Sequence, residues 1–117
     1  MGKAVQALRI TCHATDDDDV DELFMFYNGI RFWPNAGDGT VGATATGTYN
    51  VFSPIVAFNG NNVRFSLRDD ESPLGSDSLG WIDVSPDEPV GEHQADFDGG
   101  GDDGHYTLTY KVGNSDF

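Results

Sequence analysis

Acidic residues concentrate in two short stretches of the sequence. Residues 69–71 read Asp-Asp-Glu, with Asp77 close behind, and residues 16–19 are four consecutive aspartates followed by Asp21. Carboxylates held this close repel one another, and each raises the pKa of its neighbours unless a cation lies among them. Calcium suits such groups because it takes about 6–8 oxygen ligands from side chains, carbonyls and water. The two stretches therefore indicate calcium binding.

The overall charge narrows the classes of partner. The 16 Asp and 4 Glu make up 20 acidic residues against 6 basic ones, which gives a formal net charge of -14 and a pI near 4.1. This balance argues against nucleic acid, whose phosphates are bound by Lys and Arg, and against simple attraction to anionic lipid. Two simpler interpretations of the acidic composition stay open. The acids could form a solvated surface, or the chain could be the Asp-rich, Lys-poor β-sandwich of a salt-adapted (halophile-type) organism without a specific metal site.

The length of 117 residues predicts a single domain spanning residues 1–117. Cys12 is the only cysteine, so an internal disulfide is impossible. The N-terminal residues contain no uninterrupted apolar segment of signal-peptide length, and no stretch approaches the roughly 20 apolar residues of a transmembrane segment. These features leave the localisation unknown.

Catalysis is not predicted. The three histidines, His13, His93 and His105, are isolated in the sequence and do not indicate a catalytic triad. Cys12 lies near four aspartates, which would raise its pKa, whereas a nucleophilic cysteine needs an electropositive setting. We therefore expect no enzymatic activity.

Alternating apolar and polar residues predict β-strands along the whole chain. The segment that starts at residue 63 shows this alternation: one face carries Val63, Phe65 and Leu67, and the other carries arginine and serine side chains. No useful helical periodicity occurs, and the strands are separated by turn residues. The pattern predicts an all-β, antiparallel, eight-stranded β-sandwich. Its expected strands are residues 5–14, 23–33 with a turn or bulge at 28–29, 40–52, 55–58, 63–68, 81–84 after a turn at 78–80, 92–97 and 105–112.

Strand parity predicts where the acidic stretches meet. If successive strands run up and down, the connections after the first, third, fifth and seventh strands share one end of the sandwich. Three of these four connections, 15–22, 69–78 and 98–104, are acidic. We therefore expect the acidic loops to cluster at one end.

The segment from Leu67 to Gly80, LRDDESPLGSDSLG, resembles the third calcium loop of C2 domains, in which an acid, a spacer, an acid, five residues and a further acid precede an apolar-Gly turn. The aspartates 16–19 and Asp21, directly before Leu23-Phe24-Met25, resemble the family's first calcium loop. Because that loop follows the first strand and the chain ends in a strand, the circularly permuted, type II strand order is the better match. The resemblance implies a C2-like, calcium-binding β-sandwich.

Carried over to this sequence, the resemblance implies one set of metal ligands. Asp69, Glu71 and Asp77 would come from the third loop, and Asp21 with Asp16 or Asp18 from the first. Glu71 stands where the family usually has Asp, and the first loop is shorter than usual, which leaves open which of its four aspartates points inward. Participation of Asp98, Asp102 and Asp103, in the glycine-rich run before the last strand, is also open because Gly-Asp runs make ordinary hairpin loops.

In many C2 domains the filled calcium loops dock to phospholipid head groups, and Val20 and Leu74 occupy the loop tips that would insert. The basic strand patch that helps some relatives bind phosphoinositides has no counterpart in this sequence. A protein partner or self-association therefore ranks ahead of a membrane, and the candidate functions are three. They are a calcium-dependent module that binds a protein, glycan or phospholipid, a calcium-stabilised self-assembling subunit, and an acidic sandwich without metal.

Overall fold

The computed structural model describes residues 2–15, 20–34, 39–70, 75–100 and 104–114, and these residues contain strands and turns but no helix. The structure has more strands than the eight expected. They are β1 (Lys3–Ala14), β2 (Asp21–Tyr27), β3 (Ile30–Trp33), β4 (Val41–Ala43), β5 (Thr48–Asn50), β6 (Val56–Ala57), β7 (Val63–Asp70), β8 (Ser76–Val84), β9 (Gly91–Asp96) and β10 (His105–Asn114).

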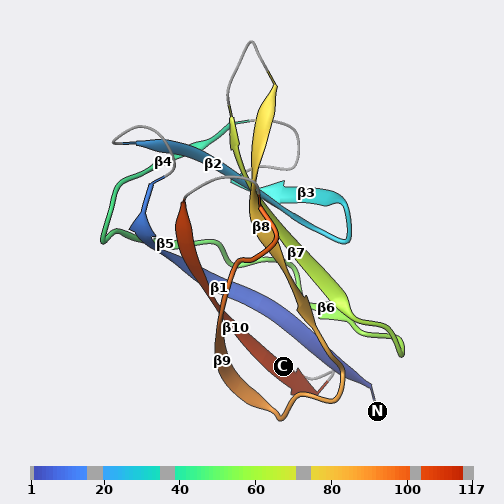
Figure 1. Ribbon diagram of the computed structural model, residues 1–117. Coiled ribbons are helices and arrows are strands. Elements are labelled where there is room, and N and C mark those ends of the chain that lie inside the picture. Colours follow the sequence, from blue (N-terminus) through green and yellow to red (C-terminus); the bar gives the residue numbers. More distant parts are fainter. Residues whose placement is uncertain (1, 16–19, 35–38, 71–74, 101–103, 115–117) are drawn as a thin grey trace.

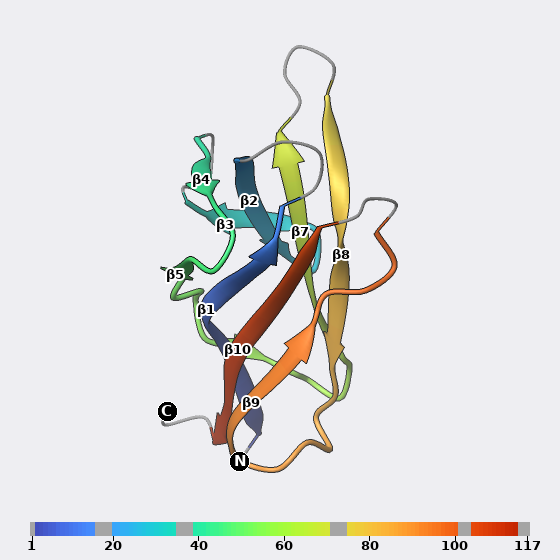
Figure 2. The same cartoon turned by 60° about the vertical axis from the view of Figure 1, so that its left-hand side comes forward.

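The strands form two antiparallel sheets that face each other (Figure 1). The first sheet has the order β5-β1-β10-β9, with β6 also paired to β1, and the second has the order β3-β2-β7-β8, with β4 also paired to β2. The end of β1, the starts of β2, β8 and β10 and the end of β7 lie in the upper part of the molecule, whereas the start of β1 and the end of β10 lie at the bottom (Figure 2). The first and last long strands, β1 and β10, are neighbours within the first sheet.

The core lies between the two sheets, and alternation along each long strand fills it as the sequence predicts. On β10 the inward residues are Tyr106, Leu108, Tyr110 and Val112, all buried. On β7 the burial alternates from Val63 through Leu67 and continues to Asp69. The inward-facing apolar residues of β7 are therefore followed by an inward-facing carboxylate at the end of the strand.

Two Asn-Gly pairs form the turns that their sequence predicts, because Asn and Gly accept the positive φ angles of tight turns. Asn28 and Gly29 have φ angles of 47° and 81° and join β2 to β3 as a hairpin. Asn59 and Gly60 have φ angles of 51° and 81°. This second turn does not form a hairpin, because β6 pairs with β1 and β7 pairs with β2, in different sheets.

The single strand expected over residues 40–52 is also wrong. Its first part, β4, pairs with β2, and its second part, β5, pairs with β1, so the chain crosses between sheets. Thr46, with a φ of 68°, lies in the turn between them. Glycines and a left-handed residue interrupt the strand, and this break accounts for part of the higher strand count.

The alternation of buried and outward-facing residues is interrupted within β1. Leu8 is the extra residue of a bulge between Ala7 and Arg9, and its carbonyl accepts hydrogen bonds from the backbone of residues 51 and 52. A bulge shifts the alternation by one residue. Ala7 and Ile10 therefore both face the core, while Leu8 is only half-buried.

Candidate functional site

Asp21 is the most deeply buried acidic residue described and lies at the start of β2, with 1% of its surface exposed. The hydroxyl of Tyr106 donates a hydrogen bond of 2.5 Å to its Oδ2 atom. This contact joins β10 of one sheet to β2 of the other. Burial, followed by the hydrogen bond to Asp21, raises the pKa of Tyr106 well above its ordinary value, so Tyr106 stays a donor at every physiological pH.

Asp69 is the second buried carboxylate, with 6% exposed. Its Oδ1 accepts a hydrogen bond of 2.8 Å from the backbone N–H of Glu22, directly after Asp21. In the ladder Asp69 pairs with Leu23, so Asp21 lies two residues further along the neighbouring strand on the same inner face. Diagonal neighbours of this kind are about 7–8 Å apart. Two buried carboxylates thus meet at one end of the core.

Asp77 pairs directly with Asp69 across β7 and β8 and is half-buried. The connection between the strands is therefore shorter than expected, because Asp69, Asp70 and Asp77 belong to strands. The expected turn at residues 78–80 is instead a bulge within β8, where Gly80 has a φ of 117°. Like charges directly opposite each other destabilise a sheet, so this pair favours a bound cation.

Asp98 has a backbone role in the third acidic connection. It forms a two-way backbone bridge with Trp81 of β8, with N···O distances of 2.8 and 3.2 Å, and its carboxylate accepts a hydrogen bond from the N–H of Gly99. A Cβ atom on Gly80 would lie 2.7 Å from the Asp98 backbone, and one on Gly99 would strike the indole ring. The glycines thus allow residues 98–100 to pack against β8.

The other predicted site residues lie outside the described residues. They are Asp16, Asp18 and Glu71 among the expected ligands, Leu74 at an expected loop tip, and Asp102 and Asp103 of the third connection. Val20, at the other expected tip, is described and 48% exposed. The structure therefore brings together Asp21, Asp69 and Asp77, three of the six predicted ligands.

Within the described ranges, no group of three or more His, Cys, Asp or Glu side chains is arranged to hold a metal ion. The part of the predicted site that is described offers carboxylate oxygens, with Asp21 and Asp69 oriented by hydrogen-bond donors. Such oxygen donors fit a hard cation such as Ca²⁺ better than a thiophilic or imidazole-binding metal. The chemistry of the donor set fits calcium, and the further ligands would have to come from outside these ranges.

Cys12 has no catalytic setting. It is completely buried beside Tyr106, its partner in the β1–β10 ladder. Burial raises the pKa of its thiol, and the charge of Asp21 raises it further. A protonated, inaccessible thiol is a core side chain.

No family model and no curated protein matches the sequence. A solved structure described as "Structure of a C2 domain" is similar with a TM-score of 0.50 and 15% identity, over 96% of this chain and 98% of the other. The chain has a C2-like fold. At this identity the likeness concerns the architecture, and it confirms the C2-like fold that the sequence predicted. The described residues contain no apolar helix of membrane-spanning length.

One group of residues in this C2-like sandwich was not found from the sequence. His13 and His105, which are far apart in the chain, have ring centroids 4.5 Å apart on the outer face of the first sheet. Asp96 and Thr107 lie beside them and connect to both rings. Only the pairing of β1 with β10 brings them together, and the sequence carries no signal for that register.

Proposed function

We propose that this chain is a calcium-binding C2-like module in which calcium orders the acidic end of the sandwich for recognition of a partner. The observation that supports it most is the pair of buried carboxylates, Asp21 and Asp69, side by side on β2 and β7. Buried charges are normally paired or bound to a metal. A cation at this end would offset the repulsion that also involves Asp77.

Asp21, Asp69 and Asp77 would hold the ion together with Glu71 and Asp16 or Asp18. Tyr106 and the N–H of Glu22 would keep the buried carboxylates in place, because each donates a hydrogen bond to one of them. The bound ion supplies positive charge among these oxygens. Binding would then stabilise the folded chain by mass action.

The partner is proposed from charge. Two calcium ions would change the formal charge from -14 to about -10 (-14 + 4). A chain that stays this acidic is repelled by anionic lipid, so a protein or a glycan ranks ahead of phospholipid. Insertion of Val20, which is exposed, together with Leu74 is the alternative route to a membrane.

Calcium titration by calorimetry in physiological salt tests the proposal. We expect saturable binding that is strongly weakened by Asp69→Asn and by Asp77→Asn, because each substitution removes a ligand charge. Asp87→Asn is the matched control, since Asp87 is an exposed acid of the connection between β8 and β9. Absence of binding, or equal binding by all four proteins, would contradict a calcium site and favour the salt-adapted acidic sandwich.

A self-assembling subunit is the second candidate. Among the described residues, the edge strand β9 pairs within its sheet only with β10, and Phe52 and Ile55 are exposed apolar side chains near the other edge. Exposed strand edges and apolar patches favour contacts between copies. Growth of particle size on addition of calcium, measured by light scattering, would favour this candidate over a monomeric binding module.

A further inference from the structure

We propose that His13 and His105 form a second metal site, independent of calcium, that binds a late divalent transition metal and prefers Cu²⁺. The site lies on the outer face of the first sheet, beside a groove of about 520 Å³ lined by His13, Asp96 and Thr107 among others. Its ligands would be the Nδ1 atoms of the two imidazoles. Asp96 would act as a positioning residue behind them.

The local backbone explains why the two rings meet. In the β1–β10 ladder Cys12 pairs with Tyr106 and Ala14 with His105, with a register shift at His13. The extra residue of such a bulge re-aims a side chain. His13 is thereby placed beside His105, with centroids 4.5 Å apart and planes tilted by 37°. Both rings are exposed to solvent, so a metal ion can reach them.

The hydrogen-bond network assigns the protons. The single hydroxyl hydrogen of Thr107 is donated to Asp96 at 2.6 Å, so the Nε2 of His13, 2.8 Å from the same hydroxyl oxygen, must donate to it. Asp96 is acceptor-only when ionised, so the Nε2 of His105, 3.2 Å away, must donate as well. Both neutral rings then carry hydrogen on Nε2 and a lone pair on Nδ1.

Among the described residues neither Nδ1 atom takes part in a hydrogen bond. A histidine that binds a metal through one nitrogen commonly donates its other N–H to a carboxylate, which fixes the ring and its tautomer. Here a single carboxylate, Asp96, holds one ring directly and the other through Thr107. The pair therefore already has the outer hydrogen bonds of metal-ligating histidines.

The spacing of the rings fits two ligands of one ion. A metal–nitrogen bond of about 2.0–2.1 Å puts a ring centroid about 3.2 Å from the ion, so ligands at roughly right angles have centroids about 4.5 Å apart. The observed separation is 4.5 Å. Right-angled nitrogen ligands with water in the other positions are typical of tetragonal Cu²⁺ and Ni²⁺.

The identity of the metal follows from the donors. Imidazole nitrogen binds Cu²⁺, Ni²⁺ and Zn²⁺ but not the oxygen-seeking Ca²⁺, and Cu²⁺ binds most tightly in this series. The described residues provide no group of three ligands, so the remaining positions would hold water. Such a site is open and exchangeable rather than a closed structural site.

The experiment is a Cu²⁺ titration of the full chain in saturating calcium, which keeps carboxylates at the acidic end occupied. We expect one Cu²⁺ per chain and an electron paramagnetic resonance spectrum with hyperfine coupling to two nitrogens. His13→Gln and His105→Gln should each remove one coupled nitrogen and weaken binding strongly. Asp96→Asn should weaken it by about tenfold while both nitrogens remain, as expected for a residue behind the ligands.

His93→Gln is the matched control because His93 is the one remaining histidine and stacks on Tyr110 of β10, away from the pair. It should bind Cu²⁺ like the wild type. Equal losses in His93→Gln and His13→Gln, or a spectrum with oxygen ligands alone, would overturn the proposal. If a variant fails to fold, the proton NMR spectrum of the wild-type protein tests the site instead. Substoichiometric Cu²⁺ should broaden the ring signals of His13 and His105 and leave those of His93 sharp. Uniform broadening of all three would contradict the site.

Discussion

Two carboxylates in this protein are held by consecutive residues of β10 and lie on opposite faces of the strand. Inside the sandwich, the Tyr106 hydroxyl donates to Asp21 at 2.5 Å. Outside, the Thr107 hydroxyl donates to Asp96 at 2.6 Å. Asp21 is 1% exposed, whereas the side chain of Asp96 is 61% exposed. The two contacts are nearly identical in length and differ in their surroundings.

The surroundings decide what each carboxylate can do. Asp21 has a second buried carboxylate, Asp69, on the neighbouring strand, so oxygen is the donor at that end and a hard cation fits. Asp96 has His13 and His105 beside it, so nitrogen is the available donor and a softer metal fits. One strand of a C2-like fold thus supports two different kinds of proposed metal chemistry.

Calcium removal should give the largest difference between the two regions. If calcium binds only the folded chain, it adds about 2.7 kcal/mol to the free energy of unfolding at a concentration 100 times its dissociation constant. Chelation with EGTA should therefore lower the urea midpoint strongly in the wild type and little in Asp69→Asn. An identical midpoint with and without EGTA in the wild type would show that calcium is not a stabilising ligand.

Removing each hydroxyl separately should give the next largest difference. Tyr106→Phe removes the hydroxyl that donates to the buried Asp21 and should cost about 1–3 kcal/mol, because burial strengthens this hydrogen bond and makes its loss expensive. Thr107→Val removes the matching hydroxyl on the exposed face and should change stability by less than about 0.5 kcal/mol. Urea denaturation of both variants measures the contrast, and equal losses would show that burial is not what separates the two carboxylates.

More of the region between the sheets, around Asp21 and Asp69, could be predicted from the sequence than of the outer region around His13 and His105. Alternation from Val63 to Leu67 extends to Asp69 and places that carboxylate inward, and the acid spacing indicated its neighbours. This worked because periodicity along one strand depends only on local residues. The strand break within residues 40–52 was missed because tertiary pairing, not propensity, assigns β4 and β5 to different sheets.

The outer region depends on register between the two ends of the chain. His13 and His105 are separated by most of the sequence, and a one-residue shift in the β1–β10 pairing would place them apart. The bulge at His13 is likewise invisible in the alternation of residues 5–14. A site made of cross-strand neighbours therefore needs the fold before it can be found.

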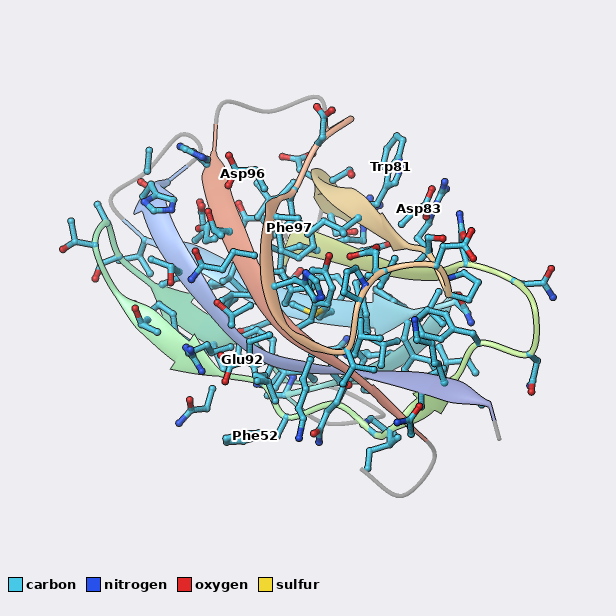
Figure 3. The ribbon with its side chains drawn as sticks, turned by 90° about the horizontal axis from the view of Figure 1, so that it is seen from below. Phe52, Trp81, Asp83, Glu92, Asp96 and Phe97 are labelled. Atoms are coloured by element: carbon cyan, nitrogen blue, oxygen red, sulfur yellow. The ribbon has the colours of Figure 1, made fainter. Side chains whose placement is uncertain are left out.

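Asp83 is a third carboxylate and gives the smallest expected effect. It accepts two hydrogen bonds from Arg64, of 2.8 and 2.9 Å, on the outer face of the second sheet, near the exposed Trp81 (Figure 3). The hydrogen bond from Arg64 lowers the pKa of Asp83 below its ordinary 3.8. A lowered pKa means that the pair stabilises the fold above about pH 4 and that this contribution is lost as the pH falls through the folded pKa.

Asp83→Asn should therefore lower the urea midpoint slightly at pH 7, and the difference from the wild type should shrink below pH 4. The effect is small because both side chains are solvated and salt screens their charges. A loss as large as that of Tyr106→Phe would show that direct charge pairing matters more here than burial. A loss that persists at low pH would show that the charge of Asp83 is not its cause. Asp83 has the stronger, charged donor, yet it is expected to contribute less than the buried Asp21 with its neutral donor, because the Arg64–Asp83 pair is solvated.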